Sequence, residues 1–235
     1  MYARTNAPEA APDAPIVVLV HGMVISSSYM APAAERLAPL SRVYAVDLPG
    51  YGKSYKPWPV LKLPQLAEAL ATWMNASALP QAHLVANSFG CQILAEFALH
   101  YPQRIDRLVF QGPTVDAAAR TFWRQFVRLL INGRREPVSL GWISLKDYAA
   151  AGLRRAWATL KIVLEDKIEE KLPYIQAPTL VVCGSRDTVA PQRWAQEVAR
   201  LLPHGSLQVI PGAAHTLNYS APEEFVQAIR PFLRL

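Results

Sequence analysis

Six short runs rich in β-branched residues constrain this chain more than any other feature of its sequence. Each run is mostly apolar and is separated from the next by a segment with apolar residues at helical spacing. Strands that are apolar on both faces must be covered on both faces, as in a parallel sheet with helices on each side. The sequence therefore predicts an α/β fold with a mostly parallel, doubly wound sheet. The runs are IVVLV (16–20), RVYAV (42–46), AHLVA (82–86), RLVFQ (107–111), TLVVC (179–183) and SLQVI (206–210).

The segments between the runs have the spacing of amphipathic helices. At 235 residues, 51% of them hydrophobic, the chain is long enough for one well-buried core and too apolar to be disordered. We therefore expect one large domain with helices on both faces of the sheet. These helices should span residues 28–40, 64–78, 88–100, 191–202 and 222–233.

One connection is far longer than the others. About 67 residues separate the fourth run from the fifth, and a crossover of that length holds helices of its own. We expect residues 116–172 to form a helical cap, inserted into a core formed by residues 1–115 and 173–235.

Two helices are expected within the cap. The first covers TFWRQFVRLLING and stops at Asn132-Gly133, a pair typical of a helix C-terminus. The second runs from about residue 147 to residue 172. Ser144 with Asp147 approximates a capping box that would open it.

The stretch HLVANSFGCQIL places Ser88 between a buried strand and an apolar helix. Small residues two positions before and after it, Ala86 and Gly90, would allow the sharp strand-to-helix turn that exposes a nucleophilic serine. A serine at such a junction can equally be an ordinary helix N-cap. This stretch alone leaves both interpretations open.

The loops that follow the other strands add the missing partners. In open parallel sheets, ligands bind outside the carboxyl ends of the strands. Asp187 follows the fifth run and His215 follows the sixth, so both should lie at the same edge of the sheet as Ser88. A serine, an acid and a histidine in that chain order favour nucleophilic catalysis by Ser88.

With these residues, the chain resembles the α/β-hydrolase family over nearly its whole length. The resemblance implies an acyl-enzyme mechanism with Ser88 as nucleophile, His215 as base and Asp187 as its partner. It also implies that the backbone N–H groups of Met23 and Phe89 form the oxyanion hole. The matching motifs are HG (21–22), DLPGYGKS (47–54), ANSFG (86–90), GSRDTVAP (184–191) and PGAAH (211–215).

Two other aspartates compete with Asp187 for the role of the acid. Asp116 follows the fourth run, where some members of the family place it, and we favour Asp187 over it. Asp47 precedes the position that the acid normally takes, so a structural role is expected. His21 should likewise be structural and fix the oxyanion loop.

The expected substrate is a small carboxylic ester with a short to medium acyl chain. We expect the side chains of Val24, Ile25, Phe122, Trp123 and Phe126 to contact it. Two alternatives stay open: hydrolysis of a carbon–carbon bond in ring-cleavage products, whose enzymes carry a similar elbow with Asn87, and a non-catalytic binding protein of the same fold.

The formal charge of +6 does not indicate nucleic acid as a partner. The cap supplies most of it, with eleven Lys and Arg against seven acids, and no nucleic-acid motif accompanies them. Arg120, Arg124 and Arg128 form a stripe on one helix, which we expect to be a solvated face, with attraction of anionic substrates or a lipid surface as the lesser alternative.

The remaining patterns indicate a cytoplasmic protein without metal or cofactor. Cys91 and Cys183 lie in apolar runs and lack metal-ligand spacing, which suits buried thiols in a reducing compartment. The phosphate-loop motif would need glycine where Asp47 stands, so no nucleotide is expected. No segment has the length and apolarity of a membrane span, so no stable membrane insertion is expected.

The start of the chain is short for the family. Relatives usually begin with a hairpin that pairs beside the strand corresponding to residues 42–46, whereas only 15 residues precede the first run here. At most a stub near residues 2–5 can pair, because Asn6, Asp13 and the prolines at 8, 12 and 15 are poor strand formers. We expect residues 42–46 to lie at or next to an uncovered edge, and a two-fold homodimer to form through that edge.

Overall fold

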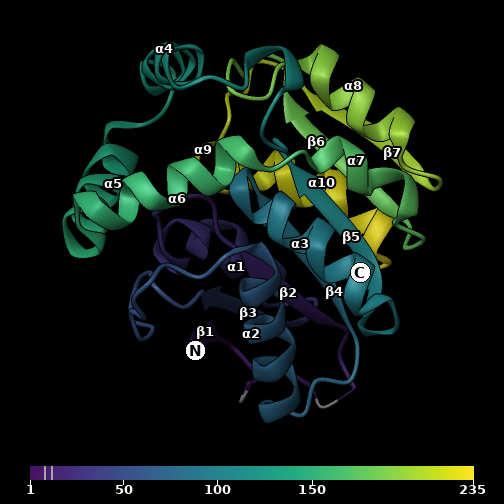
Figure 1. Cartoon of the computed structure of the whole chain (residues 1–235). Helices are drawn as coiled ribbons and strands as arrows, with labels where there is room; N and C mark the ends of the chain where they lie inside the picture. Colours follow the sequence, from purple (N-terminus) through teal and green to yellow (C-terminus); the bar gives the residue numbers. More distant parts are fainter. Residues whose placement is uncertain (8, 12) are drawn as a thin grey trace.

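The computed structural model describes residues 1–7, 9–11 and 13–235. A mixed seven-stranded sheet forms the centre of the fold (Figure 1). Its strand order is β1-β3-β2-β4-β5-β6-β7, with β1 antiparallel to β3 and every other neighbouring pair parallel. The strands are β1 (Tyr2–Thr5), β2 (Ile16–Val20), β3 (Arg42–Asp47), β4 (Ala82–Asn87), β5 (Ile105–Gln111), β6 (Thr179–Gly184) and β7 (Gly205–Ile210). The six predicted strands are confirmed, each within two residues at either end.

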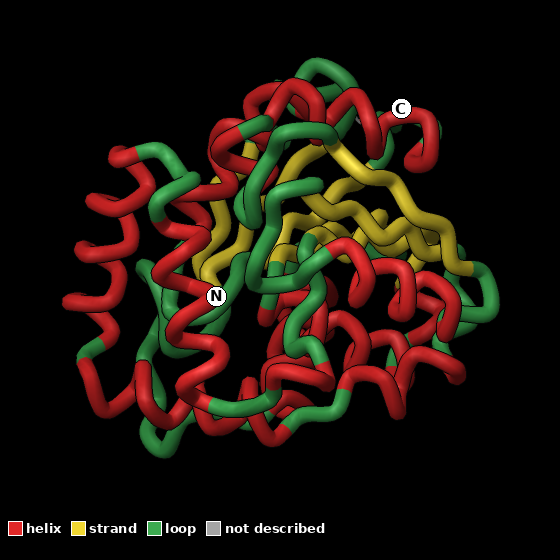
Figure 2. The backbone as a smooth tube through the Cα atoms, turned by 90° about the horizontal axis from the view of Figure 1, so that it is seen from above, coloured by secondary structure: helices red, strands yellow, loops and turns green. Residues whose placement is uncertain are grey.

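Alternation along the central strands divides the interior into two cores. Val18 and Val20 of β2 point into one apolar cluster, and Val17 and Leu19 point into the other. All four side chains are buried, because helices cover both faces of the sheet (Figure 2). The predicted doubly wound fold is therefore confirmed.

Each core has its own layer of helices. One cluster takes in side chains of α2 (Leu63–Ala76), α3 (Phe89–His100) and α8 (Gln192–Leu201). The other takes in α1 (Ala31–Leu37) and α10 (Pro222–Leu233). Short helices complete the core: η1 (Ser27–Met30), η2 (Pro102–Arg104), η4 (Leu172–Tyr174) and α9 (Leu217–Ser220). No helix within the described ranges is long and apolar enough to cross a membrane.

Residues 42–46 lie next to the edge of the sheet and not at it, because the predicted stub forms the edge strand β1. β1 pairs with β3 from Tyr2 opposite Asp47 to Thr5 opposite Tyr44. Where β1 ends, the Asn6 side chain continues the cover, since its Oδ1 accepts the Val43 N–H at 2.7 Å. β3 therefore has no free edge of its own, and a dimer through this side of the sheet stays a prediction. Two of the prolines named in that prediction, at positions 8 and 12, lie outside the described residues.

The cap between β5 and β6 is helical, but its second helix differs from the prediction. After η3 (Ala117–Ala119), α4 (Phe122–Gly133) ends where expected. The single helix expected from residue 147 to 172 is instead split into α5 (Val138–Ala151), α6 (Leu153–Glu165) and α7 (Ile168–Lys171). Gly152 separates α5 from α6 with φ of 81°, a conformation that an α-helix cannot contain. Ser144 and Asp147 therefore lie inside α5 and do not open a helix.

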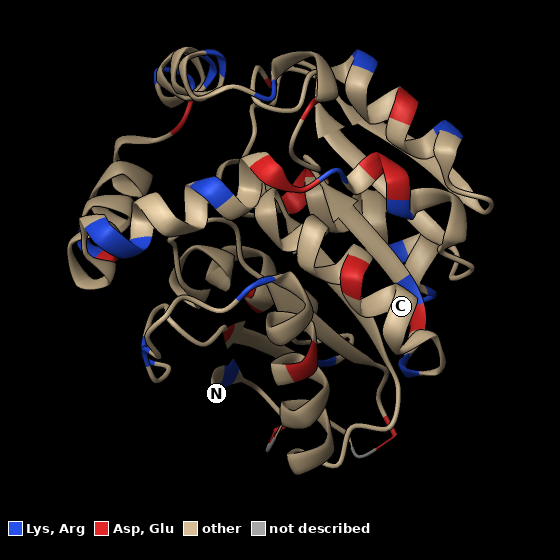
Figure 3. Cartoon of the chain, viewed as in Figure 1, with Lys and Arg blue, Asp and Glu red and all other residues tan. Residues whose placement is uncertain are grey.

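The three arginines expected to form a solvated stripe are not uniformly solvated; Figure 3 shows where Lys and Arg lie along the chain. Arg120 Nη2 lies 2.6 Å from both carboxylate oxygens of Glu169, and Arg128 Nη1 lies 2.8 Å from Asp116 Oδ2. Both arginine side chains are mostly buried, whereas Arg124 is exposed. Arg120 precedes α4, which begins at Phe122, so the three do not form one helix face, and spacing in the sequence does not reveal which acids lie near them. Arg120 and Arg128 therefore stabilise the cap through ion pairs.

Candidate active site

Ser88 lies on a sharp turn between β4 and α3. Its φ of 57° and ψ of −121° fall outside the regions that side-chain-bearing residues normally adopt, at a cost of about 1–3 kcal/mol. A Cβ atom at Gly90 would lie 2.8 Å from the carbonyl oxygens of Val20 and His21, so only glycine fits there. It would also lie 3.2 Å from the Ala86 Cβ. Because Gly90 has no side chain, the turn has room for the Ala86 methyl group. The turn has the geometry of a nucleophile elbow.

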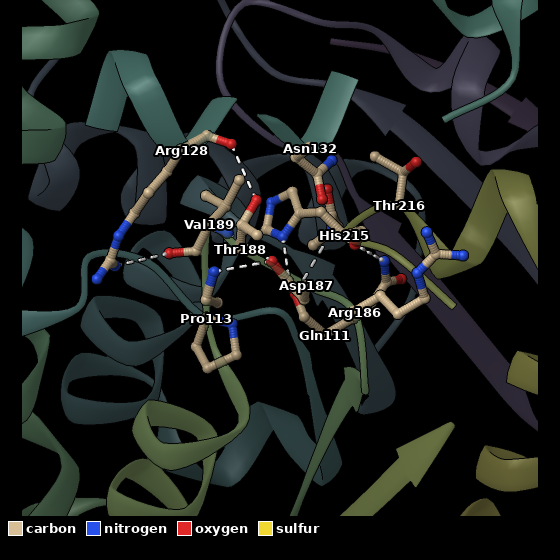
Figure 4. A network of polar contacts seen from close by, with 12 residues as sticks. Gln111, Pro113, Arg128, Asn132, Arg186, Asp187, Thr188, Val189, His215 and Thr216 are labelled. Atoms are coloured by element: carbon tan, nitrogen blue, oxygen red, sulfur yellow. Dashed lines mark hydrogen bonds and ion pairs between the residues drawn. The ribbon is translucent and has the colours of Figure 1, made fainter. Parts of the chain in front are cut away.

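His215 and Asp187 form a buried hydrogen-bonded pair beside this turn (Figure 4). His215 Nδ1 lies 2.8 Å from Asp187 Oδ2, while Asp187 Oδ1 accepts the N–H groups of Val189 and Ala190 at 2.8 and 2.9 Å. Gly112 makes room for the pair, since a Cβ there would lie 2.8 Å from His215 Nδ1. The carboxylate thus fixes Nδ1 as the protonated nitrogen and leaves Nε2 as the available base.

The pKa of His215 is raised above its ordinary value. Burial by itself would lower it, because the charged imidazolium loses its hydration. The negative charge and hydrogen bond of Asp187 outweigh that effect, and the carboxylate of Glu136 adds to them. The side chain is consequently a stronger base than a histidine in water.

The two competing aspartates are occupied elsewhere. Asp116 binds Arg128 and Arg193 and accepts the Ala118 N–H at 3.0 Å. Burial would raise the pKa of Asp116, but these partners lower it overall. Asp47 accepts backbone N–H groups from two separate loops, at residues 27 and 53, over 2.6 and 2.8 Å. Only Asp187 contacts His215 among the three.

The loop after β2 presents backbone N–H groups to the same region. His21 anchors it, with Nδ1 2.7 Å from the Gly22 oxygen and Nε2 accepting the Leu48 N–H at 3.0 Å. Burial lowers the pKa of His21, so this histidine is neutral, as its two contacts require. The Met23 and Phe89 N–H groups have no acceptor within the described ranges, and both residues line the cavity that Ser88 faces. They can therefore donate to an anionic oxygen there.

A chamber of about 160 Å³ lies over Ser88 between the core and the cap. Ser88, His215 and Ile25 line it from the core. A second, more open and mainly apolar cavity of about 530 Å³ adjoins it and shares five lining residues with it. The shared residues are Met23, Gln125, Leu129, Tyr148 and Leu160.

The expected substrate contacts divide into three groups. Ile25 lines the chamber, and Phe122 and Phe126 line the adjoining groove. Trp123 is 70% exposed and lines neither cavity, because it projects from the outer side of α4. Val24 is also outside both, since the loop turns it into the core.

Sequence reasoning missed Leu129, Tyr148 and Leu160. Leu129 was visible, because it continues the line of Phe122 and Phe126 at helical spacing. Tyr148 lies on α5 and Leu160 on α6, and the two helices are separated at Gly152. Because that break was not predicted, nothing in the sequence indicated that these two side chains line one cavity.

The cap is bonded directly to the loops that carry Asp187 and His215 (Figure 4). The Thr188 hydroxyl donates to the Arg128 carbonyl at 3.0 Å, and Glu136 Oε1 accepts the Thr216 N–H at 2.9 Å. These contacts join α4 and the start of α5 to the residues that follow the acid and the histidine. Within the described part of the chain, no cluster of His, Cys, Asp or Glu could hold a metal ion.

The family model described as "Alpha/beta hydrolase family" matches residues 17–228. The chain belongs to the alpha/beta hydrolase family. It is 26% identical over 243 residues to pimeloyl-(acyl-carrier protein) methyl ester esterase of Serratia marcescens, covering 92% of this chain and 93% of that protein.

Two further comparisons agree with this membership. A putative carbamate hydrolase of Yersinia enterocolitica is 26% identical over 237 residues, covering 91% of this hydrolase and 85% of the relative. The crystal structure of a hydrolase from Pseudomonas aeruginosa superposes with a TM-score of 0.81 at 25% identity, covering 99% and 94% of the two chains.

Proposed function

We propose that this hydrolase cleaves carboxylic esters of short to medium acyl chain through an acyl-enzyme on Ser88. One observation carries the proposal: Ser88, on its strained turn, lines the same chamber as His215, whose Nδ1 is held by Asp187. That combination supplies a nucleophile, a base and an orienting acid in one site.

The reaction follows from the positions of these groups. His215 Nε2 takes the hydroxyl proton as Ser88 Oγ attacks the ester carbonyl, and Asp187 stabilises the imidazolium that forms. The Met23 and Phe89 N–H groups stabilise the negative oxygen of the tetrahedral intermediate. His215 then protonates the departing alkoxide. Water, activated by the same imidazole, releases the acid from Ser88.

The two cavities support an uncharged, apolar acyl group. No Lys, Arg, Asp or Glu of the described residues lines either of them. The chamber is narrow, and the groove that continues it between α4 and α6 is mainly apolar. Acyl chains of about four to eight carbons would fill the chamber and reach the groove.

A panel of chromogenic esters of increasing acyl length tests this function. Turnover should be highest near four to eight carbons and absent in Ser88→Ala, and an alkyl organophosphonate should form one adduct, on the peptide containing Ser88. Adduct formation at another serine would overturn the mechanism. Cleavage of a dienone ring-cleavage product with no ester turnover would favour the carbon–carbon hydrolase instead.

We also propose a reducing, cytoplasmic setting. Cys91 and Cys183 are both free and buried, and burial raises the pKa of the Cys183 thiol to about 12. Such a thiol stays protonated and unreactive. Fractionation of cells expressing the native chain would test this localisation.

A further inference from the structure

Four polar side chains lie fully buried beneath the site and take no part in the proposed reaction. Tyr29, Asn87, Gln111 and Asn218 are each at most 2% exposed. They come from four separate segments: η1, the end of β4, the end of β5 and α9. Buried polar groups are costly unless each is hydrogen-bonded, so their partners reveal what they hold in place.

Their hydrogen bonds form a closed ring. The Tyr29 hydroxyl donates to Asn87 Oδ1 at 2.7 Å, and Asn87 Nδ2 donates to the His215 carbonyl at 3.4 Å. Gln111 Nε2 donates to the same carbonyl at 3.1 Å and to Asn218 Oδ1 at 2.9 Å. Asn218 Nδ2 donates to the Tyr29 carbonyl at 3.0 Å, which completes the ring.

The ring reaches the oxyanion loop through a single atom. The Tyr29 hydroxyl oxygen accepts the Gly22 N–H at 2.7 Å while its proton goes to Asn87. Burial raises the pKa of Tyr29 far above its ordinary value, so the hydroxyl keeps its proton and can do both. Gly22 directly precedes Met23, and fixing one peptide plane restricts the orientation of the next N–H.

We propose that Tyr29 is a positioning residue that aims the Met23 N–H at the oxyanion. Its hydroxyl bridges the oxyanion loop to Asn87, the residue before the nucleophile, so the two sides of the oxyanion hole share one fixed reference. A Cβ at Gly22 would lie 3.2 Å from the Tyr29 hydroxyl oxygen and 3.3 Å from the Ser88 Cβ, which shows how closely the loop and the elbow approach. The inference rests on the proposed function, because it concerns how that reaction is stabilised.

Tyr29→Phe tests the inference, since it removes the hydroxyl and keeps the ring. An aligned oxyanion donor is worth about 10²–10³ in kcat, and partial misalignment should cost about 10- to 100-fold. KM should change less than about twofold, because the donor acts mainly on the transition state. Binding of an alkyl boronic acid, which forms a tetrahedral adduct on the serine, should weaken by the same factor as kcat.

Tyr51→Phe is the matched control. Tyr51 is also a buried tyrosine; its ring packs against His21 and is kept in the variant, while the hydroxyl that is removed lies 2.7 Å from Thr159 Oγ1 on α6. Its kcat should stay within about twofold of the native value, and thermal melting of both variants should give similar losses of stability. Equal loss of kcat in the two variants, or native kcat and boronate affinity in Tyr29→Phe, would overturn the inference.

Two further variants complete the test. If Tyr29→Phe does not fold, Asn218→Ala breaks the ring at the Tyr29 carbonyl and is judged by the same criteria, with a smaller expected loss of kcat. Ser88→Ala separates the two proposals. Turnover in Ser88→Ala would defeat the proposed function itself, whereas an inactive Ser88→Ala beside a fully active Tyr29→Phe would defeat this inference alone.

Discussion

The floor and the roof of the site are held by different kinds of contact. Beneath Ser88, neutral amides and a hydroxyl form a ring of hydrogen bonds among fully buried side chains. Above it, ion pairs such as Arg128 with Asp116 hold the cap, while apolar side chains at the groove stay exposed, Trp157 by 52% and Leu153 by 87%. The difference indicates that the floor fixes the chemistry and that the roof sets which substrates are accepted.

The largest effect should come from replacing the proposed nucleophile, Ser88. Ser88→Ala removes the nucleophile, and loss of a serine of this kind reduces kcat by about 10⁶-fold. The fold should be unchanged, because no side-chain hydrogen bond of Ser88 supports it among the described residues. Ester hydrolysis and far-ultraviolet circular dichroism would check both parts. Retained turnover would show that the chemistry does not depend on Ser88 and would contradict the assignment of the chemistry to this side of the site.

The two rival acids compare floor and roof directly. Asp187→Asn should lower kcat by about 10⁴-fold, because the amide favours the wrong tautomer of His215. Asp116→Asn weakens the ion pairs with Arg128 and Arg193, so it should loosen the cap and cost less than about tenfold. Steady-state kinetics on one ester would rank them. The reverse ranking would mean that Asp116, and not Asp187, is the acid that pairs with His215.

A truncation in the roof should change chain-length preference and leave the chemistry intact. Trp157→Ala removes one wall of the groove, and each methylene that loses burial costs about 0.8 kcal/mol. We expect kcat/KM for an eight-carbon acyl chain to fall several-fold relative to a four-carbon chain. Trp123→Ala is the control, since Trp123 lies in the cap but outside both cavities. An equal effect of both variants would contradict the assignment of the groove.

The smallest effect is a shift in the pH dependence of activity, caused by Glu136, which joins the cap to the loop that carries His215. Only neutral imidazole can accept the serine proton, and the pKa of His215 is raised, so activity should fall with decreasing pH at a midpoint above about 6.5. Glu136→Gln removes a negative charge that raises this pKa but keeps an oxygen for the Thr216 N–H. The midpoint should therefore move to lower pH.

Glu165→Gln serves as the control for this shift, because the charge of Glu165 does not contribute to the pKa of His215. The midpoint of kcat/KM against pH should stay at its native position in that variant. A midpoint that Glu136→Gln leaves unmoved would show that the cap does not tune the base.

The proposed catalytic residues could be predicted from the sequence, because the sheet determines where they lie. Parallel strands end at one edge, so residues that follow three strands, Ser88, Asp187 and His215, had to be neighbours. Gln111 also carried a signal as a polar residue at the end of an apolar strand. Tyr29 carried none, because a tyrosine in a loop does not reveal which amide its hydroxyl reaches.

The roof was harder to predict, because its contacts depend on helix boundaries and packing angles. The glycine at position 152 separates α5 from α6 where a single helix was expected, and Tyr148 and Leu160 on the two sides of that break line a common cavity. Trp123 and Leu129 both looked apolar and both lie on α4, yet only Leu129 faces the site. Helical spacing identifies a shared face but not what that face meets.

The four-residue strand β1 has a practical consequence for producing the protein. Together with the Asn6 side chain, it pairs with the backbone of β3 at that side of the sheet. Trimming the first six residues, or fusing a tag that pulls them away, would expose the unpaired backbone of β3, whose residues Val43, Ala45 and Val46 are apolar, and chains would associate edge to edge. Purification tags therefore belong at the C-terminus, and any shortened version should be checked for aggregation before its activity is interpreted.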